Sequence, residues 1–228
     1  MSGPRDAHGG LRLFGHPATA AMIPHLVLRE LGVPFDWVHV DRDRDAHKAP
    51  DYLKLNPNGL IPVLIDARGP EEIVLYETTA IVWHLADAFP EVGLAPAVGT
   101  AARAHAYKWV AWLSATLQPT LLAYFYPDRW VDSGNASGVD QVRRHAEAKV
   151  GPMLDQLDAH LAAHRAPWML GEAFSIVDPY AFTLCRWTRG FAHPARARPA
   201  LGAYLGRMLD RPAMRRVLAD EGIEPPFV

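Results

Sequence analysis

The pattern of apolar residues changes at Pro90, and this change limits the chain to a two-part architecture. Before Pro90, short apolar runs typical of strands alternate with segments in which apolar residues recur at helical spacing. Beyond a Pro- and Gly-rich stretch over 90–100, only long helical periods remain. The sequence therefore predicts a mixed α/β domain followed by an all-helical domain.

The expected elements of the first part follow the order β-α-β-α-β-β-α, with strands over 11–15, 35–40, 61–66 and 72–77. Pro24 fits the first helix only in its first turn or at a kink. The expected helices of the second part cover 101–125, 138–164, 176–190 and 200–219. The predicted organisation is a polar N-terminal extension (1–10), an α/β domain (11–89), a linker (90–100) and a helical domain (101–228).

Composition excludes several classes of protein. Half of the 228 residues are hydrophobic, the net charge is −2, and no basic tract points to nucleic acid. Cys185 is the single cysteine, so no intramolecular disulfide is expected. The first ten residues do not resemble a signal peptide, and no apolar run reaches the roughly 20 residues that cross a bilayer. We therefore expect a soluble cytoplasmic protein with no membrane partner and no metal site.

The first motif with chemical meaning is NGLIPVL, over 58–64. A proline that opens an apolar strand removes a hydrogen-bond donor from the sheet. One solution is a cis Ile61–Pro62 bond, which would offer the backbone N–H and C=O of Ile61 to a ligand. The alternative is an ordinary proline at a strand edge.

The second motif is LYETTAIVWHL, in which Glu77 precedes Thr78 and Thr79 at the start of a helix. Either threonine can cap that helix. The N-terminal N–H groups and the helix dipole favour a carboxylate, while Glu77 suits an ammonium group, so an α-amino acid head would satisfy both. The alternative is a plain N-cap with no ligand.

The third motif, FSIVDPYAF, spaces Ser175 and Asp178 as a capping box, with Asp in place of the commoner Glu. It predicts the start of a buried helix and a structural role.

In this order, the three motifs resemble the cytosolic glutathione transferase family, and the resemblance extends from about residue 11 to 218. It implies a thioredoxin-like N-terminal domain, an all-α C-terminal domain and glutathione as co-substrate. FGHPAT near the N-terminus is similar to the phi class and its bacterial relatives, whereas GEAFSIVDPYAFTLCRW is similar to the bacterial beta class.

The resemblance places the activating group on the turn after the first strand. Phi-like members have serine where Thr19 stands, the beta class has cysteine at the position of Ala20, and no tyrosine lies near Gly15. Thr19 is therefore the expected catalytic residue. A hydroxyl that donates to the glutathione sulfur favours the thiolate, which is the nucleophile. The alternative is that Thr19 only caps the first helix.

The same resemblance assigns the rest of the glutathione site. His47 and Lys48 match a pair that faces the glycine carboxylate. Ile61 and Pro62 contact the cysteinyl unit, while Leu60 replaces the usual Gln or Lys. Glu77 and Thr78 hold the γ-glutamyl amine and carboxylate. An alternative for the first pair is a solvated polar loop.

The resemblance also implies a homodimer, a role in detoxification, and a small hydrophobic electrophile as second substrate. His16, Tyr107 and Trp112 are the expected walls of the electrophile pocket. Two alternatives remain open at this stage. One is a non-catalytic glutathione- or ligand-binding protein of the same fold, and the other is a glutathione-dependent peroxidase, reductase or isomerase.

Overall fold

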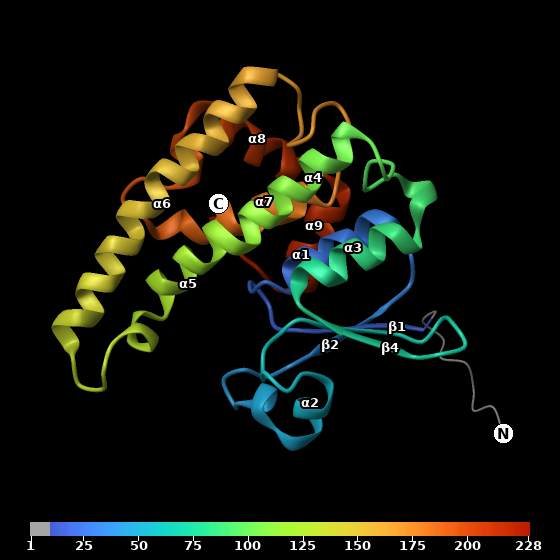
Figure 1. The fold of residues 1–228 in the computed structure, drawn as a ribbon, viewed down its shortest axis with the longest axis horizontal. Helices are drawn as coiled ribbons and strands as arrows, with labels where there is room; N and C mark the ends of the chain where they lie inside the picture. Colours follow the sequence, from blue (N-terminus) through green and yellow to red (C-terminus); the bar gives the residue numbers. More distant parts are fainter. Residues whose placement is uncertain (1–9) are drawn as a thin grey trace. The chain divides into compact units, whose positions relative to one another are not determined.

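The computed structural model describes residues 10–228 (Figure 1). The N-terminal extension predicted over 1–10 therefore lies, apart from Gly10, outside the described residues. These residues divide into two compact units: 10–95 with 211–224, and 96–210 with 225–228. The boundary after Ala95 falls within the predicted linker. Residues 211–224, in contrast, belong to the first unit, although the sequence placed them in the helical domain.

The first unit contains a four-stranded sheet in the order β2-β1-β3-β4. Its elements are β1 (Leu11–Gly15), α1 (Met22–Leu31), β2 (Asp36–His39), the 3₁₀ turn η1 (Ala46–Lys48), α2 (Pro50–Leu55), β3 (Val63–Asp66), β4 (Ile73–Tyr76), α3 (Thr78–Ala88), the 3₁₀ turn η2 (Pro90–Val92) and α9 (Pro212–Asp220). β1 runs parallel to β2 and antiparallel to β3, and β3 runs antiparallel to β4. The mixed sheet and the order of the elements along the chain are those expected of the thioredoxin-like domain.

Helices cover both faces of this sheet. In Figure 1, α1 and α3 lie on one side of the strands and α2 lies on the other. Tyr52 of α2 packs with Val40 and Val63 in a separate small core. Pro24 lies in the first turn of α1, as expected, because its missing N–H is not needed there.

The second unit is helical. Its elements are α4 (Ala101–Trp112), a π-helical turn (Leu113–Leu117), α5 (Gln118–Phe125), the 3₁₀ turn η4 (Pro127–Trp130), α6 (Ala136–His164), α7 (Val177–Trp187), two further 3₁₀ turns (Thr188–Gly190 and Ala195–Ala197) and α8 (Pro199–Asp210). The helix predicted over 101–125 thus contains a π-turn just before Pro119, which has no N–H to continue the ladder.

The helix predicted over 200–219 is wrong as a single element. It is broken at Arg211, whose backbone is extended, and α9 begins at Pro212. A residue before proline is disfavoured in the helical region, and proline at the first helical position is favoured. The break therefore follows from the Arg-Pro pair, and it coincides with the return of the chain to the first unit.

Candidate functional site: one edge of the first-unit sheet

Three segments of the first unit meet at one edge of its sheet. The register pairs Phe14 with Val63 and Val63 with Tyr76. The end of β1, the start of β3 and the end of β4 therefore lie side by side. The turn over 16–21, the Ile61–Pro62 bond and Glu77 each continue from these positions, so the sheet brings together two of the three motifs and the turn that the resemblance singled out.

The turn after β1 carries Thr19 in a closed hydrogen-bond pattern. The Thr19 hydroxyl donates to the carbonyl oxygen of His16 at 2.6 Å and accepts from the N–H of Ala21 at 3.3 Å. Ala21 stands at the N-cap of α1, so Thr19 does not cap the helix from the N-cap position. The hydroxyl has one hydrogen, and it must turn away from His16 to donate to a ligand.

The amide next to Thr19 is a donor that the sequence motifs did not reveal. Within the described residues, the N–H of Ala20 donates no hydrogen bond. The N–H groups of Met22 and Ile23 bond to carbonyl oxygens of the turn instead. The Ala20 amide is therefore a second candidate donor toward an anion at this turn.

His16 is tied to the end of β2. Its Nδ1 lies 3.0 Å from the carbonyl oxygen of Val40 and 3.2 Å from Nε2 of His39. Since a carbonyl oxygen only accepts, the His16 Nδ1 carries the hydrogen in the bond to Val40. The ring is thus held in a fixed orientation beside the turn.

The Ile61–Pro62 peptide bond is cis, which confirms the first of the two interpretations of NGLIPVL. The carbonyl of Leu60 accepts hydrogen bonds from the Tyr52 hydroxyl at 2.9 Å and from Asn56 Nδ2 at 2.8 Å. Within the described residues, the backbone of Ile61 makes no hydrogen bond. The loop is therefore anchored through Leu60, and the N–H and C=O of Ile61 remain available to a ligand.

The Leu60 side chain is 52% exposed. It offers an apolar surface where the family pattern has a polar side chain. Tyr52 and Asn56, which hold this loop, were not identified from the sequence, although Asn56 lies in the NPNG turn.

The predicted cationic pair lies directly beside the cis-proline loop. A Cβ at Gly59 would approach the His47 carbonyl oxygen to 3.2 Å, so this loop and η1 are in close contact. Lys48 Nζ lies 2.8 Å from Asp45, and a hydrogen bond from Lys48 lowers the pKa of that carboxyl. Both partners of this ion pair are largely exposed and well solvated, so Lys48 can exchange Asp45 for another carboxylate at little cost.

The N-terminus of α3 is open. The expectation that Thr78 or Thr79 is the N-cap of this helix is wrong, because Glu77 occupies that position, and the Glu77 side chain makes no capping bond. Glu77 has φ 70° and ψ 112°, an uncommon conformation for a residue with a side chain. Thr78 is buried at the first helical position. A helix start beside an exposed carboxylate suits an ammonium and a carboxylate together.

A carboxylate directly after α9 also contacts the turn, and the sequence motifs did not identify it. Glu221 Oε2 accepts a hydrogen bond from the N–H of Ala18 at 2.8 Å, one residue before Thr19. The two residues are far apart in the sequence, so no local pattern could have connected them.

The two candidate pocket residues of the second unit do not share a helix face. Tyr107 is 48% exposed and lies under the Arg103 guanidinium, 5.0 Å from the ring centroid. Trp112 packs edge-on against Trp109, with ring centroids 5.6 Å apart. Side chains five residues apart on an α-helix point about 140° apart. They do not form one continuous wall on α4.

Ser175 and Asp178 hydrogen-bond to each other at the start of α7, as the spacing predicts, although the N-cap of this helix is Ile176. Asp178 accepts from the Ser175 N–H at 2.8 Å, and the Ser175 hydroxyl accepts from Val177 N at 3.3 Å. Asp178 is completely buried, and burial raises the pKa of its carboxyl group to about 6. These contacts organise the start of α7 inside the second unit.

Two absences bear on the chemistry. Among residues 10–228, no group of three or more His, Cys, Asp and Glu side chains is arranged to hold a metal ion. In the same part of the chain, no helix has both the length and the apolar character to span a membrane.

Comparison with known proteins shows what this arrangement is similar to. The model of the glutathione S-transferase N-terminal domain matches residues 20–88, and that of the C-terminal domain matches 140–207. Glutathione S-transferase 3 of Zea mays is 33% identical over 224 residues, which are 95% of this chain and 96% of the relative. The chain belongs to the glutathione S-transferase family.

Solved structures of glutathione S-transferases agree with this assignment. A sphingomonad glutathione S-transferase complexed with glutathione has a TM-score of 0.79 and 31% identity, covering 93% of this chain and all of that one. A Sulfitobacter glutathione transferase homologue with bound glutathione has a TM-score of 0.84 and 26% identity, covering 95% and 100%. The expected fold and family are therefore confirmed, and glutathione transferase is the activity that these relatives support.

Proposed function

We propose that this protein activates the thiol of glutathione as a thiolate, which attacks a small apolar electrophile. The observation that carries the proposal is the meeting of three features at one sheet edge: the hydroxyl of Thr19, the open backbone of Ile61, and the start of α3 at the exposed Glu77. A thiol, a peptide backbone and an α-amino acid head are the groups that these features suit. Glutathione carries all three.

Thr19 is the proposed activating residue. The glutathione thiol is mostly protonated at neutral pH, since a free cysteine thiol has a pKa of about 8.5. A hydrogen bond to a charged acceptor contributes about 1.5–3 kcal/mol, which corresponds to a pKa lowered by roughly one to two units. The Ala20 N–H and the start of α1 add to this effect.

The remaining residues of the proposed site bind the ends of glutathione. His47 and Lys48 face the glycine carboxylate, Ile61 and Pro62 the cysteinyl unit, and Glu77 with Thr78 the γ-glutamyl head. Leu60 belongs to the proposed glutathione site, and His16, Tyr107 and Trp112 are the proposed contacts of the electrophile.

We further propose a cytoplasmic homodimer. Family membership supports both features. Three large side chains of β4, Ile73, Val74 and Tyr76, are each more than a third exposed, which suits a strand that meets another subunit.

The role of Thr19 is tested by comparing Thr19→Val with Thr19→Ser. Val keeps the shape but has no hydroxyl, so we expect kcat/KM for glutathione and a chloro-dinitroaromatic electrophile to fall about 10- to 100-fold. Ser keeps the hydroxyl without the methyl group that restricts the Thr rotamer, and it should retain or exceed wild-type activity.

Glutathione binding is measured by calorimetry on the same proteins. Equal activity of Thr19→Val and wild type would show that another group activates the thiol. Binding of glutathione without turnover in any of the three proteins would establish the non-catalytic alternative instead.

A further inference from the structure

Ion pairs between charged side chains hold the C-terminal segment of the first unit against α1. Arg211 donates two hydrogen bonds to Glu30, both at 2.6 Å. Arg29 and Asp220 form an ion pair at 2.6 Å. These contacts fix α9 along α1, so the position of residue 221 relative to α1 is well defined.

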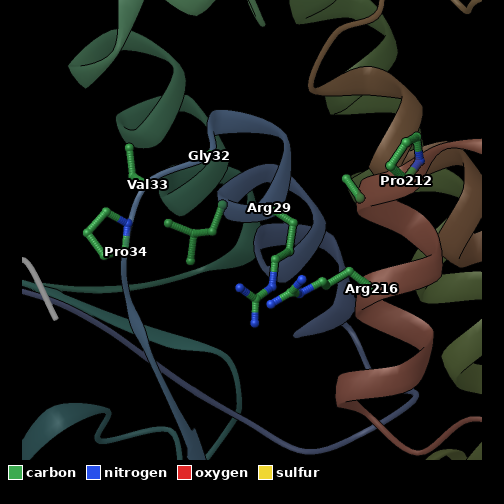
Figure 2. A pocket seen from close by; sticks show the side chains of 8 residues that line it. Arg29, Gly32, Val33, Pro34, Pro212 and Arg216 are labelled. Atoms are coloured by element: carbon green, nitrogen blue, oxygen red, sulfur yellow. The ribbon is translucent and has the colours of Figure 1, made fainter.

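The two ends of this helix pair differ. Near the C-terminus of α1, the helices leave an open groove, where Figure 2 shows Arg29 of α1 and Arg216 of α9 pointing toward one another. Near the N-terminus of α1, the seam is closed by Glu221 and His25, whose side chains are both fully buried. The closed end is the one that adjoins the turn carrying Thr19.

Glu221 makes two hydrogen bonds there with its two carboxylate oxygens. Oε1 lies 2.9 Å from His25 Nδ1, and Oε2 accepts from the N–H of Ala18 at 2.8 Å. His25 is itself held by stacking on Trp37, with ring centroids 4.6 Å apart. The carboxylate therefore links a rigid part of α1 to the backbone of the turn.

The backbone of the turn needs such a support. Ala18 has φ 61°, in the left-handed region, which costs roughly 1–2 kcal/mol for a residue other than glycine. Thr19 follows directly, and its carbonyl oxygen accepts from the N–H of Met22 at the start of α1. A change at Ala18 would move the hydroxyl of Thr19 and the N–H of Ala20 together.

We propose that Glu221 is a positioning residue for thiol activation, acting through the Ala18 N–H on the orientation of Thr19 and Ala20. This inference rests on the proposed function. It assigns a part in the chemistry to a residue that lies 203 positions after Ala18 in the sequence.

The test measures two quantities in Glu221→Ala and in Glu30→Gln. The matched control, Glu30→Gln, weakens the ion pair with Arg211 but removes no contact with the turn. The first quantity is the hydrogen-exchange rate of the Ala18 amide without ligand. The second is the pKa of the bound glutathione thiol, followed by the ultraviolet absorbance of the thiolate.

We expect Glu221→Ala to speed exchange of the Ala18 amide at least about tenfold and to raise the thiol pKa by about one unit, or tenfold less thiolate at a given pH. Glu30→Gln should leave both unchanged. If Glu221→Ala does not fold, Glu221→Asp replaces it, because the shorter side chain keeps the charge but cannot reach both partners. An unchanged thiol pKa in the folded variant overturns the proposal.

The two proposals fail in different ways. If wild type binds no glutathione, the proposed function fails, while the exchange rate of the Ala18 amide still reports whether Glu221 holds the turn. If wild type binds and activates glutathione but Glu221→Ala does so equally well, only the positioning role is overturned. An equal loss of thiolate in Glu221→Ala and Glu30→Gln would also overturn it, since the effect would then come from the packing of α9 on α1 and not from the hydrogen bond to Ala18.

Discussion

The carboxyl group of Asp178 shows how a single buried residue can carry a pH dependence. It receives hydrogen bonds from the N–H of Met169, the N–H and hydroxyl of Ser175, and the hydroxyl of Tyr204. Burial raises the pKa from its ordinary 3.8 to about 6, although these hydrogen bonds lower it. Between these two values, the carboxyl group is therefore more protonated in the folded state than in the unfolded state.

This raised pKa predicts that Asp178 stabilises the fold more at low pH than at neutral pH. The folded state binds more protons than the unfolded state between about pH 4 and pH 6, so the contribution falls as the pH rises through this window and is constant above it. Two pKa units correspond to a change on the order of 3 kcal/mol.

The measurement is the free energy of unfolding of wild type and Asp178→Asn from pH 4 to pH 8. The difference between the two proteins, which removes the effect of other groups, should shrink as the pH rises to about 6 and then level off. A difference that grows with pH would contradict the raised pKa.

Individual residues also show how far sequence reasoning reaches at the site. The motifs singled out Ile61, Glu77 and Thr78 as candidates because their neighbours in the chain constrain the local backbone. Glu221 was missed because its partners, Ala18 and His25, are about 200 residues away, and only the packing of α9 on α1 brings them together.

At the scale of elements, the contact between η1 and the cis-proline loop depends on Gly59. Its φ is 59°, and a Cβ would lie 3.2 Å from the His47 carbonyl oxygen. Addition of a methyl group therefore pushes the two segments apart by a few tenths of an ångström, in addition to the cost of the left-handed backbone.

We expect Gly59→Ala to lower the free energy of unfolding by about 1–3 kcal/mol and to weaken glutathione binding several-fold. The matched control is Gly93→Ala, since Gly93 has φ 77° but has no neighbour within 4 Å of an added Cβ. The control should lose about 1–2 kcal/mol of stability without a change in binding. Chemical denaturation and calorimetry give the two quantities, and equal binding by both variants would refute the role of this contact.

The order of the elements in the first unit was predictable, because each strand is a short apolar run and apolar residues recur at helical spacing in each helix. The residues at which helices end were harder to predict. The helix expected over 200–219 has an apolar period that continues through Arg211 and Pro212, and only the backbone restriction at that pair divides it.

At the scale of the whole molecule, the return of 211–224 to the first unit is the feature that the sequence did not indicate. Apolar residues recur in 211–224 at the same helical spacing as in the second unit, so the sequence pattern alone places this segment in the helical domain. Met214, Val217 and Leu218 form the buried apolar face of α9. The sequence shows that this face needs a partner surface, but only the folded structure shows that the surface belongs to α1.

This division predicts that residues 10–95 do not fold stably alone. Burial of three large apolar side chains contributes roughly 5–8 kcal/mol, which is comparable to the total stability of a domain. The isolated fragment should show no cooperative thermal transition by circular dichroism, and a synthetic peptide of residues 211–224 should restore one.

The matched control is the same peptide with Val217→Asp, which places a charge on the buried face and should restore nothing. A cooperative transition of the fragment with the same midpoint in the presence and absence of the peptide would contradict the prediction.

The late position of Glu221 has a consequence for biosynthesis. Domains generally fold in the order in which the ribosome makes them, the N-terminal one first. Here residues 96–210 are translated before α9 can close over α1. Most of the helical unit can therefore fold before α9 is made, and residues 225–228 join it last. A nascent chain interrupted before Glu221 carries Thr19 on a turn that lacks the hydrogen bond from Ala18 to Glu221.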